Sequence, residues 1–141
     1  MTESMRKERV LLFIDHLMGG GAQRQIVALA NELHRRGYAV EIVTYYPGDQ
    51  LSHTLRSPEI RITTLSRHSR LDPTYPFRLL LYLRRRRPDC IISYLTTPNF
   101  WARVVGRLGG VRRVITSERN VTPGRRRGLA RLEWLLWRAS T

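Results

Sequence analysis

Short apolar runs alternate with amphipathic stretches along the first half of the chain. Residues Val10 to Ile14 are apolar at every position, which is typical of a strand buried on both faces of a parallel sheet. Residues Ala39 to Tyr45 predict a second strand. Between them, apolar residues recur at the i, i+3, i+4 and i+7 spacing of an amphipathic helix: Ile26, Leu29, Ala30 and Leu33. Gly37 stands where a glycine commonly ends a helix.

The alternation continues through the second half of the chain. Residues 50–57 predict one short helix before Pro58. Residues 60–65 alternate apolar and polar side chains, which predicts a strand nearer the edge of the sheet. The remaining predicted elements are strands at residues 90–94 and 111–117, and helices at residues 76–87, 98–108 and 124–138.

This alternation of strands and helices predicts the fold class. It favours an α/β fold, with an open parallel sheet of about five or more strands and helices on both faces. Right-handed crossovers place the loops that follow the strands along one edge of such a sheet, and ligands bind there. We therefore expect the functional residues in the loops at 15–22, 45–50, 65–74, 94–99 and 117–124.

Positive charge is the unusual feature of the composition. The net charge is +14, and 24 of the 25 cationic side chains are arginine. Residues 73–141 hold fifteen arginines and three acids, a net charge of +12, whereas residues 1–72 carry only +2. A polyanionic partner would explain this asymmetry: nucleic acid, an anionic membrane surface or a phosphorylated substrate. Solvated helix faces are an alternative that needs no ligand.

Length and cysteine content restrict the class of protein further. The 141 residues make about one domain, and an apolar fraction of 42% allows a sizeable core. The longest uninterrupted apolar runs have five residues, far fewer than the ~20 of a spanning helix, and Asp15 interrupts the first run too early for a signal peptide. Cys90 alone makes neither a disulfide nor a cysteine-built zinc site, and it fits a small buried apolar position. We expect a cytoplasmic protein without a membrane span or a metal.

The loop at residues 15–24 combines glycines with a following helix. Three glycines, Gly19 to Gly21, would let the backbone approach a ligand closely, and the helix N-terminus would favour a phosphate. A dinucleotide-binding fingerprint would need a glycine where Arg24 stands, and the Gly-Lys-Ser/Thr of a Walker A loop is absent. The spacing alone leaves two interpretations open, an anion site and a tight turn without a ligand.

Three segments of the chain resemble family 4 glycosyltransferases, which have the GT-B fold. The first is Gly-Gly-Gly-Ala-Gln-Arg at 19–24, continued by Ala-Leu-Ala-Asn-Glu-Leu at 28–33 and Arg-Gly-Tyr-Ala-Val at 36–40. The second is Ile-Ile-Ser-Tyr at 91–94 with Asn99, and the third is Val-Ile-Thr-Ser-Glu-Arg-Asn at 114–120. The resemblance spans roughly residues 9–140, and its last run is similar to members that extend lipid-linked or capsular glycans.

The resemblance implies a fold and a domain organisation. Residues 9–141 are expected to form a Rossmann-like domain, the N-terminal, acceptor-side half of a GT-B fold, incomplete at its C-terminus, and residues 1–8 are expected to be frayed. In this family a second domain carries the nucleotide-binding pocket and an E-x7-E motif. The resemblance therefore implies a parent hexosyltransferase that retains the anomeric configuration, with no activity in the 141 residues alone.

The resemblance also assigns site residues. It places the donor diphosphate at the backbone of Gly20 and Gly21, with Gln23 and Arg24 nearby. Acceptor contacts fall to residues at the ends of the strands: His16, Thr96, Asn99, Glu118, Arg119 and Asn120. His16 could instead be an ordinary exposed loop residue without a ligand. Asn99 could instead cap the helix that begins near Pro98. The nucleotide sugar is a substrate, so no resident cofactor is implied, and no catalytic residue is assigned.

The expected partners follow from the resemblance and the charge together. They are a nucleotide sugar, a lipid-linked or cell-envelope glycan acceptor, an anionic membrane surface and the second domain. Arg125, Arg126 and Arg127 stand near Trp134 and Trp137, as in a helix that lies on an anionic membrane, although the same stripe would also suit packing on the sheet. This predicts a peripheral position at the inner face of the cytoplasmic membrane.

Two alternative functions are weaker. The first is a basic nucleic-acid-binding α/β module, which the net charge favours but no helix-turn-helix, RRM or zinc-finger pattern supports. The second is a domain that binds a phosphate or nucleotide without catalysis. We do not expect nucleic acid as the partner.

Overall fold

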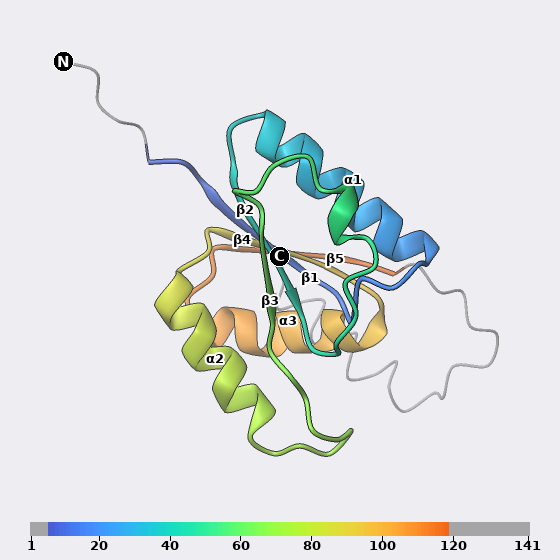
Figure 1. Ribbon diagram of the computed structural model, residues 1–141. Coiled ribbons are helices and arrows are strands. Elements are labelled where there is room, and N and C mark those ends of the chain that lie inside the picture. The colour runs from blue at the N-terminus through green and yellow to red at the C-terminus, as the bar shows by residue number, and fades with distance from the viewer. Residues whose placement is uncertain (1–5, 119–141) are drawn as a thin grey trace.

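Five parallel strands form a single sheet in the order β3-β2-β1-β4-β5 (Figure 1). The computed structural model describes residues 6–118 of the chain. The strands are β1 (Arg9–Phe13), β2 (Ala39–Thr44), β3 (Arg61–Thr64), β4 (Cys90–Tyr94) and β5 (Arg113–Ser117). The helices are α1 (Gly21–Arg35), the short 3-10 helix η1 (Ser52–Thr54), α2 (Tyr75–Arg86) and α3 (Thr96–Leu108).

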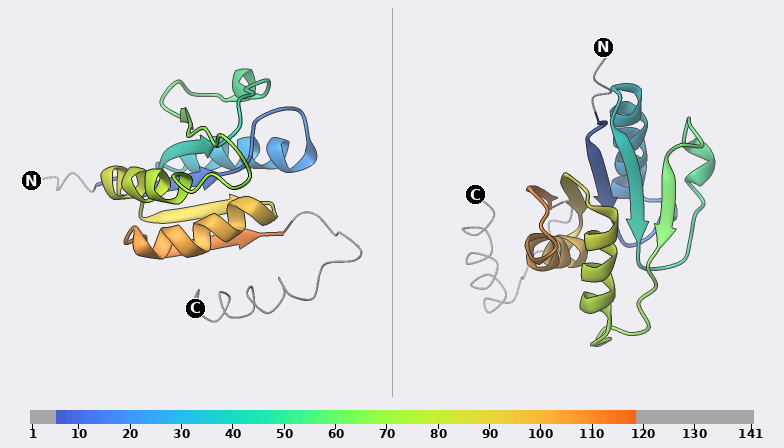
Figure 2. Two further views of the ribbon diagram at one scale, coloured as in Figure 1. Left: turned by 90° about the horizontal axis from the view of Figure 1, so that it is seen from below. Right: turned by 90° about the vertical axis from the view of Figure 1, so that its left-hand side faces the viewer.

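Helices cover both faces of this sheet. In Figure 1, α1 lies on one side of the strands, and α2 and α3 lie on the other. The right-hand view of Figure 2 shows the arrows of β1, β2 and β3 pointing the same way, as parallel pairing requires. The predicted α/β architecture is therefore confirmed, with Rossmann-like strand order.

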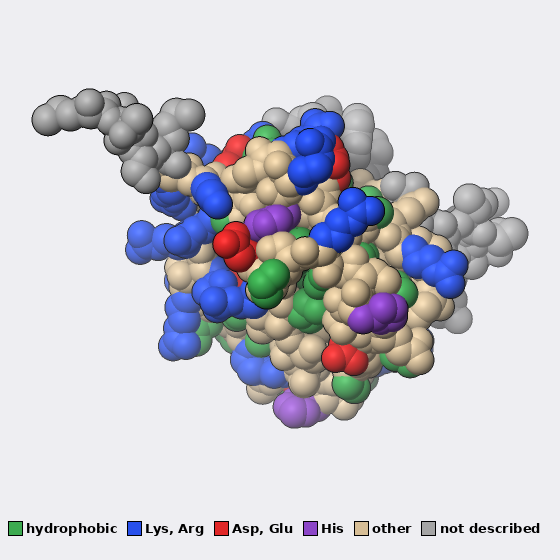
Figure 3. Space-filling model, turned by 45° about the horizontal axis from the view of Figure 1, so that its top comes forward, with side chains coloured by type: hydrophobic (Ala, Val, Ile, Leu, Met, Phe, Trp, Pro, Cys, Tyr) green, Lys and Arg blue, Asp and Glu red, His purple; other side chains and the backbone are tan. Residues whose placement is uncertain are grey.

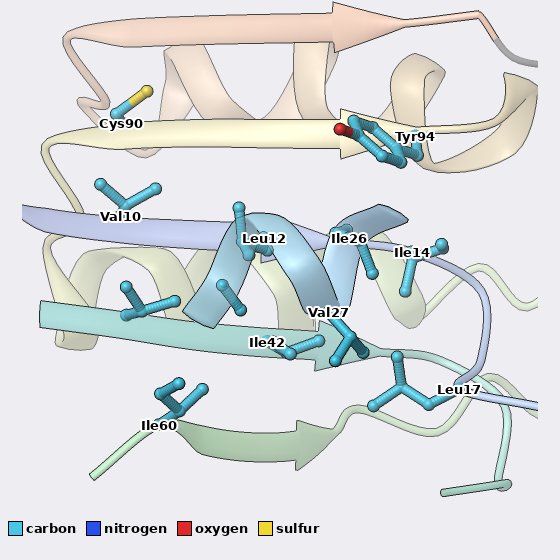
Figure 4. Close-up of a cluster of buried hydrophobic side chains, with 12 residues drawn as sticks. Val10, Leu12, Ile14, Leu17, Ile26, Val27, Ile42, Ile60, Cys90 and Tyr94 are labelled. Carbon is cyan, nitrogen blue, oxygen red and sulfur yellow. The ribbon is translucent and has the colours of Figure 1, made fainter. Parts of the chain in front are cut away.

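The core on the α1 side is built from every second residue of the central strands. Val10 and Leu12 of β1 pack with Ile42 of β2 against Ile26 and Val27 of α1 (Figure 4). All of these side chains are buried, at most 4% exposed. Because successive strand residues point to opposite faces, the other residues of β1 face the second layer.

The core on the opposite side joins the sheet to α2 and α3. Leu79 and Leu83 of α2 and Val105 of α3 are buried there against Leu11 and Phe13 of β1. β1 is thus apolar on both faces, which explains its uninterrupted apolar run. This layer also contains a buried carboxylate, which is described below because it bears on stability.

Glu41 of β2 is 9% exposed and is held by three side chains. Its Oε2 atom lies 2.9 Å from Arg86 Nε, and its Oε1 atom accepts a hydrogen bond of 2.9 Å from the Thr63 hydroxyl. The Tyr82 hydroxyl donates to the same Oε1 atom. A buried carboxylate is tolerated when it is paired and hydrogen-bonded in this way.

The boundaries of several elements differ from those that the sequence predicts. The helix expected at 50–57 is only the single turn η1, and the strand expected from residue 111 begins at Arg113. The later start of β5 has a local cause: the Val111 N–H donates to the carbonyl of Gly106 and so completes the end of α3. The third strand lies at the edge of the sheet, as predicted. The helix expected at 124–138 lies outside the described residues.

Candidate functional site

The candidate site lies where β1 and β4 end side by side. These two strands are neighbours in the sheet, yet the helix after β1 covers one face and the helix after β4 covers the other. Such a reversal of strand order opens a crevice at the carboxyl ends of the strands. The loops that follow β1 and β4 border this crevice.

The glycine loop leads from β1 into α1 without a capping side chain. Gly20 is the N-cap residue in an extended conformation, and no side chain caps the helix. The first turn of α1 also holds no acidic residue. The N–H groups at this helix end and the positive end of its dipole are therefore available to an anion.

Gly20 and Gly21 differ in what surrounds them. A Cβ atom at Gly20 would lie 2.2 Å from Oε1 of Gln23, because the Gln23 side chain folds back over the loop. A Cβ atom at Gly21 would meet nothing within 4 Å. A side chain at Gly20 would therefore displace the end of the Gln23 side chain, whereas the space beside Gly21 is open.

Asp15 organises the rest of this loop. Its Oδ1 atom accepts hydrogen bonds from the His16 N–H at 2.7 Å and from Gln23 Nε2 at 3.1 Å. His16 Nε2 lies 3.5 Å from Asp15 Oδ2, and His16 Nδ1 accepts a hydrogen bond of 3.2 Å from the Met18 N–H. Two predicted site residues, His16 and Gln23, are therefore held by one carboxylate at the end of β1.

The segment that follows β2 supports the glycine loop from the side. The N–H groups of Tyr45 and Tyr46 donate to the Asp15 carbonyl, and Leu17 N–H donates to the Gly48 carbonyl at 2.9 Å. Gly48 has φ +130, and a Cβ atom there would lie 2.7 Å from the Met18 side chain. Only glycine fits this close and left-handed turn, so the two loops are fixed relative to each other.

The turn from β4 into α3 is strained and leaves a second helix N-terminus uncapped. Leu95 has φ +76, an unfavourable value for a residue with a side chain. Its N–H donates to the Ser117 carbonyl at 3.2 Å, which holds the turn against β5. No side chain caps α3, and its first turn holds no acid. Thr96 and Thr97 are exposed at this helix end.

Asn99 is buried beneath this turn, with 1% of its surface exposed. Its Oδ1 atom accepts a hydrogen bond of 2.7 Å from the Ser93 hydroxyl, and its Nδ2 atom donates to the Ser117 carbonyl over 3.1 Å. The side chain thus connects β4, α3 and β5. This connection is a third arrangement, different from both the acceptor contact and the helix cap considered for Asn99.

A cluster of aromatic rings around Arg67 was not singled out from the sequence. The Arg67 guanidinium carbon lies 5.9 Å from the ring centres of both Tyr45 and Trp101. Tyr75 joins both rings at 6.1 and 5.8 Å, and burial raises the pKa of the Tyr45 and Tyr75 hydroxyls. In the described part of the chain the Tyr75 hydroxyl and Arg67 Nε are buried without a hydrogen-bond partner. The only sequence signal was the topological one, that residues 65–74 follow a strand.

The structure brings the predicted residues together in two groups. His16, Gln23 and the glycines share the loop after β1 and the start of α1, and Thr96 and Asn99 share the turn after β4. Tyr45, which follows β2, lies beside Thr97 at this turn. Glu118 is exposed at the end of β5. The other predicted residues lie outside the described part: Arg119, Asn120, Arg125, Arg126, Arg127, Trp134 and Trp137.

The described surface also has hollows away from these two loops. One of about 920 Å³ lies between α1 and residues 51–57 and includes Arg24. Within residues 6–118, no three His, Cys, Asp or Glu side chains gather where they would hold a metal ion, and no helix has the length and apolar content to cross a membrane.

The strand order and the helices on both faces define the class of protein, a Rossmann-like α/β domain. At the carboxyl edge of its sheet, α1 and α3 begin without a capping side chain. The particular family follows from sequence comparison. Residues 19–141 match the model of Glycosyltransferase Family 4, and the chain belongs to this family. It has the fold of the N-terminal part of a GT-B enzyme. A search of curated protein sequences gave no match.

Two solved structures show the same fold. MurG from Acinetobacter baumannii superposes with a TM-score of 0.67 at 17% identity, over 95% of this chain and 40% of that chain. A glycosyltransferase from Rickettsia africae ESF-5 superposes with a TM-score of 0.60 at 13% identity, over 79% of this chain and 29% of that chain. The chain thus spans less than half the length of either relative, and at these identities the likeness concerns the fold alone.

Proposed function

We propose that this chain is the acceptor-side domain of a nucleotide-sugar-dependent glycosyltransferase. The proposed reaction moves a hexose or N-acetylhexosamine to a hydroxyl of a lipid-linked or cell-envelope glycan. The anomeric carbon forms a bond to the acceptor oxygen, its bond to the donor diphosphate breaks, and the acceptor hydroxyl loses its proton. Retention of the anomeric configuration is part of the proposal through family membership.

One observation carries this proposal. Two helices on opposite faces of the sheet, α1 and α3, begin at the same crevice, and neither has a capping side chain or an acid in its first turn. An anionic diphosphate at the glycine loop would accept hydrogen bonds from the N–H groups of α1 near Gly21. The same dipole would stabilise the negative charge that grows on the leaving diphosphate as the sugar departs.

The donor and acceptor contacts are divided between the two strand ends. We assign the diphosphate to the backbone of Gly20 and Gly21, with Arg24 exposed one helical turn away and Gln23 held by Asp15. We assign His16, Thr96 and Glu118, which follow the ends of β1, β4 and β5, to the acceptor side. Arg119 and Asn120 remain acceptor residues in this proposal. Asn99 remains one indirectly, because its hydrogen bonds position the turn between β4 and α3.

The proposal also includes a second domain and a membrane. A nucleotide-binding domain would close the crevice over the donor, and a peripheral position at the cytoplasmic membrane would bring the enzyme to a lipid-linked acceptor. The positive charge of the chain supports the position at the membrane. Arg125 to Arg127, Trp134 and Trp137, proposed as membrane contacts, lie outside the described residues.

The test is a transfer assay with the full-length protein. Radiolabelled nucleotide sugars, hexose and N-acetylhexosamine donors in turn, are incubated with lipid-linked oligosaccharide acceptors, and the lipid fraction is analysed for one added sugar. We expect product with one donor and loss of product when the acceptor is omitted. A folded full-length protein that binds no nucleotide sugar in calorimetry would contradict the proposal.

A further inference from the structure

The outward side of α2 carries apolar side chains where polar ones are usual. Phe77 is 73% exposed and Leu81 is 51% exposed, while Tyr75, Leu79 and Leu83 on the opposite side are buried in the core. Isolated exposed apolar residues are common in soluble proteins. Phe77 and Leu81, however, are neighbours one turn apart on a single helix.

The loop that leads into α2 extends this apolar surface. Leu71 is 90% exposed, the highest value among the large apolar residues that the structure describes. The right-hand view of Figure 2 shows this loop joining β3 to the lower end of α2. Three of the seven large exposed apolar side chains in residues 6–118 therefore lie on α2 or directly before it.

Arginines complete the same side of the helix. At about 100° per residue, Phe77, Leu81, Arg84 and Arg85 fall within an arc of roughly 100°. Arg84 and Arg85 are exposed, and so is Arg70 beside Leu71. Within the described chain, the side chains of these three arginines make no ion pair or hydrogen bond.

The other two arginines of α2 are paired. Arg78 pairs with Asp72 at 2.8 Å, and Arg86 pairs with Glu41 at 2.9 Å. Within α2, the two unpaired arginines are thus the ones that share the outward side with the apolar residues. At the far end of α2, Lys7, Arg9 and Arg61 line a hollow of about 350 Å³, and Figure 3 shows Lys and Arg side chains gathered on the left-hand side of the view.

We propose that this surface binds an anionic lipid membrane. We call it the α2 stripe, and it comprises Arg70, Leu71, Phe77, Leu81, Arg84 and Arg85. The aromatic ring and the leucines would enter the boundary between headgroups and acyl chains, and the guanidinium groups would bind lipid phosphates. A plane of lipid phosphates offers negative charge everywhere along the helix, which suits a stripe that has cations and no acid of its own.

This proposal deepens the proposed function, since it rests on the membrane partner and names the surface that meets it. α2 begins at the carboxyl edge of the sheet, where the loop from β3 enters it. Leu71 and Phe77 are therefore on the same edge as the glycine loop. A membrane that contacts the α2 stripe would lie close to the crevice, where a lipid-linked acceptor has to enter.

The test measures vesicle binding by the full chain, without donor or acceptor. Co-sedimentation is compared between mixed phosphatidylglycerol–phosphatidylcholine vesicles and pure phosphatidylcholine vesicles. We expect binding only to the anionic vesicles, weakened about fivefold for each arginine removed in R84Q and R84Q/R85Q at low salt. F77Q/L81Q should weaken binding by about tenfold or more, because buried apolar area is lost. Raising the salt from about 0.1 M to about 1 M should remove most of the difference between wild type and R84Q/R85Q.

A matched pair of control substitutions lies on the other face of the molecule. Ile115 is 51% exposed on β5, and Arg56 is exposed beside α1. I115T and R56Q change the same kinds of side chain, so they should leave vesicle binding within about twofold of wild type. Circular dichroism verifies that each variant keeps its helix content.

Two outcomes would overturn the α2 stripe. Equal sedimentation of wild type and F77Q/L81Q/R84Q/R85Q with anionic vesicles would move the membrane contact elsewhere in the chain. Absence of vesicle binding together with tight RNA binding that R84Q/R85Q weakens would assign the arginines to nucleic acid instead. Neither outcome depends on sugar transfer, which the assay of the full-length protein tests separately.

Discussion

The hydroxyl of Ser93 donates a hydrogen bond of 2.7 Å to Oδ1 of Asn99, and both residues are buried, at 0% and 1% exposure. Asn99 also donates to the Ser117 carbonyl at the end of β5. One amide side chain therefore joins two strand ends to the first turn of α3. The position of the exposed threonines at that turn depends on it.

Asn99→Ala should lower the free energy of unfolding by about 1 to 3 kcal/mol, because it leaves the Ser93 hydroxyl buried without a partner and removes one of the two donors to the Ser117 carbonyl, which keeps the Leu95 N–H. Urea unfolding of the variant measures this loss. Ser93→Ala removes the donor of the first bond, and the double variant should lose less than the two single variants combined. Unchanged stability with weaker acceptor binding in the full-length protein would instead make Asn99 a direct acceptor contact.

Gly21→Val should leave the stability of the domain within about 1 kcal/mol of wild type, because a Cβ atom at Gly21 meets nothing within 4 Å. It should weaken donor binding by the full-length protein at least about tenfold, since the added methyl groups occupy the space assigned to the diphosphate. Calorimetric titration with a nucleotide sugar measures the effect.

Gly20→Ala is the companion variant, and its expected effect has another origin. Its Cβ atom would displace the Gln23 side chain and break the hydrogen bond to Asp15, so stability should fall by about 1 kcal/mol. Donor affinity that is the same in wild type and Gly21→Val would refute the diphosphate assignment, whatever Gly20→Ala does.

The location of the glycine loop was predictable because it depends on local patterns. The apolar run of β1, the glycines and the helical repeat of α1 follow one another directly in the sequence, so the strand–loop–helix order determines where the loop lies. The edge position of β3 was predictable as well, because its residues alternate in polarity.

The contacts that shape the site were not predictable. Asn99 meets Ser117 across 18 positions of sequence, and Tyr82 meets Glu41 across 41. Arg67 lies in a loop that has no periodicity, and its partners come from the segment that follows β2 and from α3. No spacing rule relates such residues before the strand order is known.

Arg67→Ala should lower the free energy of unfolding by about 1 to 2 kcal/mol, because the guanidinium stacks on the rings of both Tyr45 and Trp101. Arg67→Lys should recover less than half of the loss, since an ammonium group lacks the flat face that stacks on a ring. Urea unfolding compares the three proteins. As a control, Arg56→Ala removes an exposed arginine that contacts no ring and should have almost no effect; full recovery by lysine would mean that charge alone matters at position 67.

The stability of the domain should fall at alkaline pH because of buried tyrosines. Burial, together with the hydrogen bond to the Glu41 carboxylate, raises the pKa of Tyr82 to about 12. Burial also raises the pKa of Tyr45 and Tyr75. In the unfolded chain these hydroxyls titrate near pH 10. Above that pH the unfolded state binds fewer protons than the folded state, so the free energy of unfolding decreases as pH rises.

The contribution of Tyr82 is therefore fully present below about pH 10 and is lost as pH rises through about 12. Tyr82→Phe keeps the ring and removes the proton, so its stability should decline less steeply between these pH values than that of wild type. Urea unfolding at several pH values gives the two slopes, and ultraviolet absorbance of tyrosinate follows the ionisation directly. Tyr38→Phe serves as the control, because Tyr38 makes no side-chain hydrogen bond in the described chain and should leave the slope nearly unchanged. Identical slopes for wild type and Tyr82→Phe would show that the Tyr82 hydroxyl ionises alike in the folded and unfolded states.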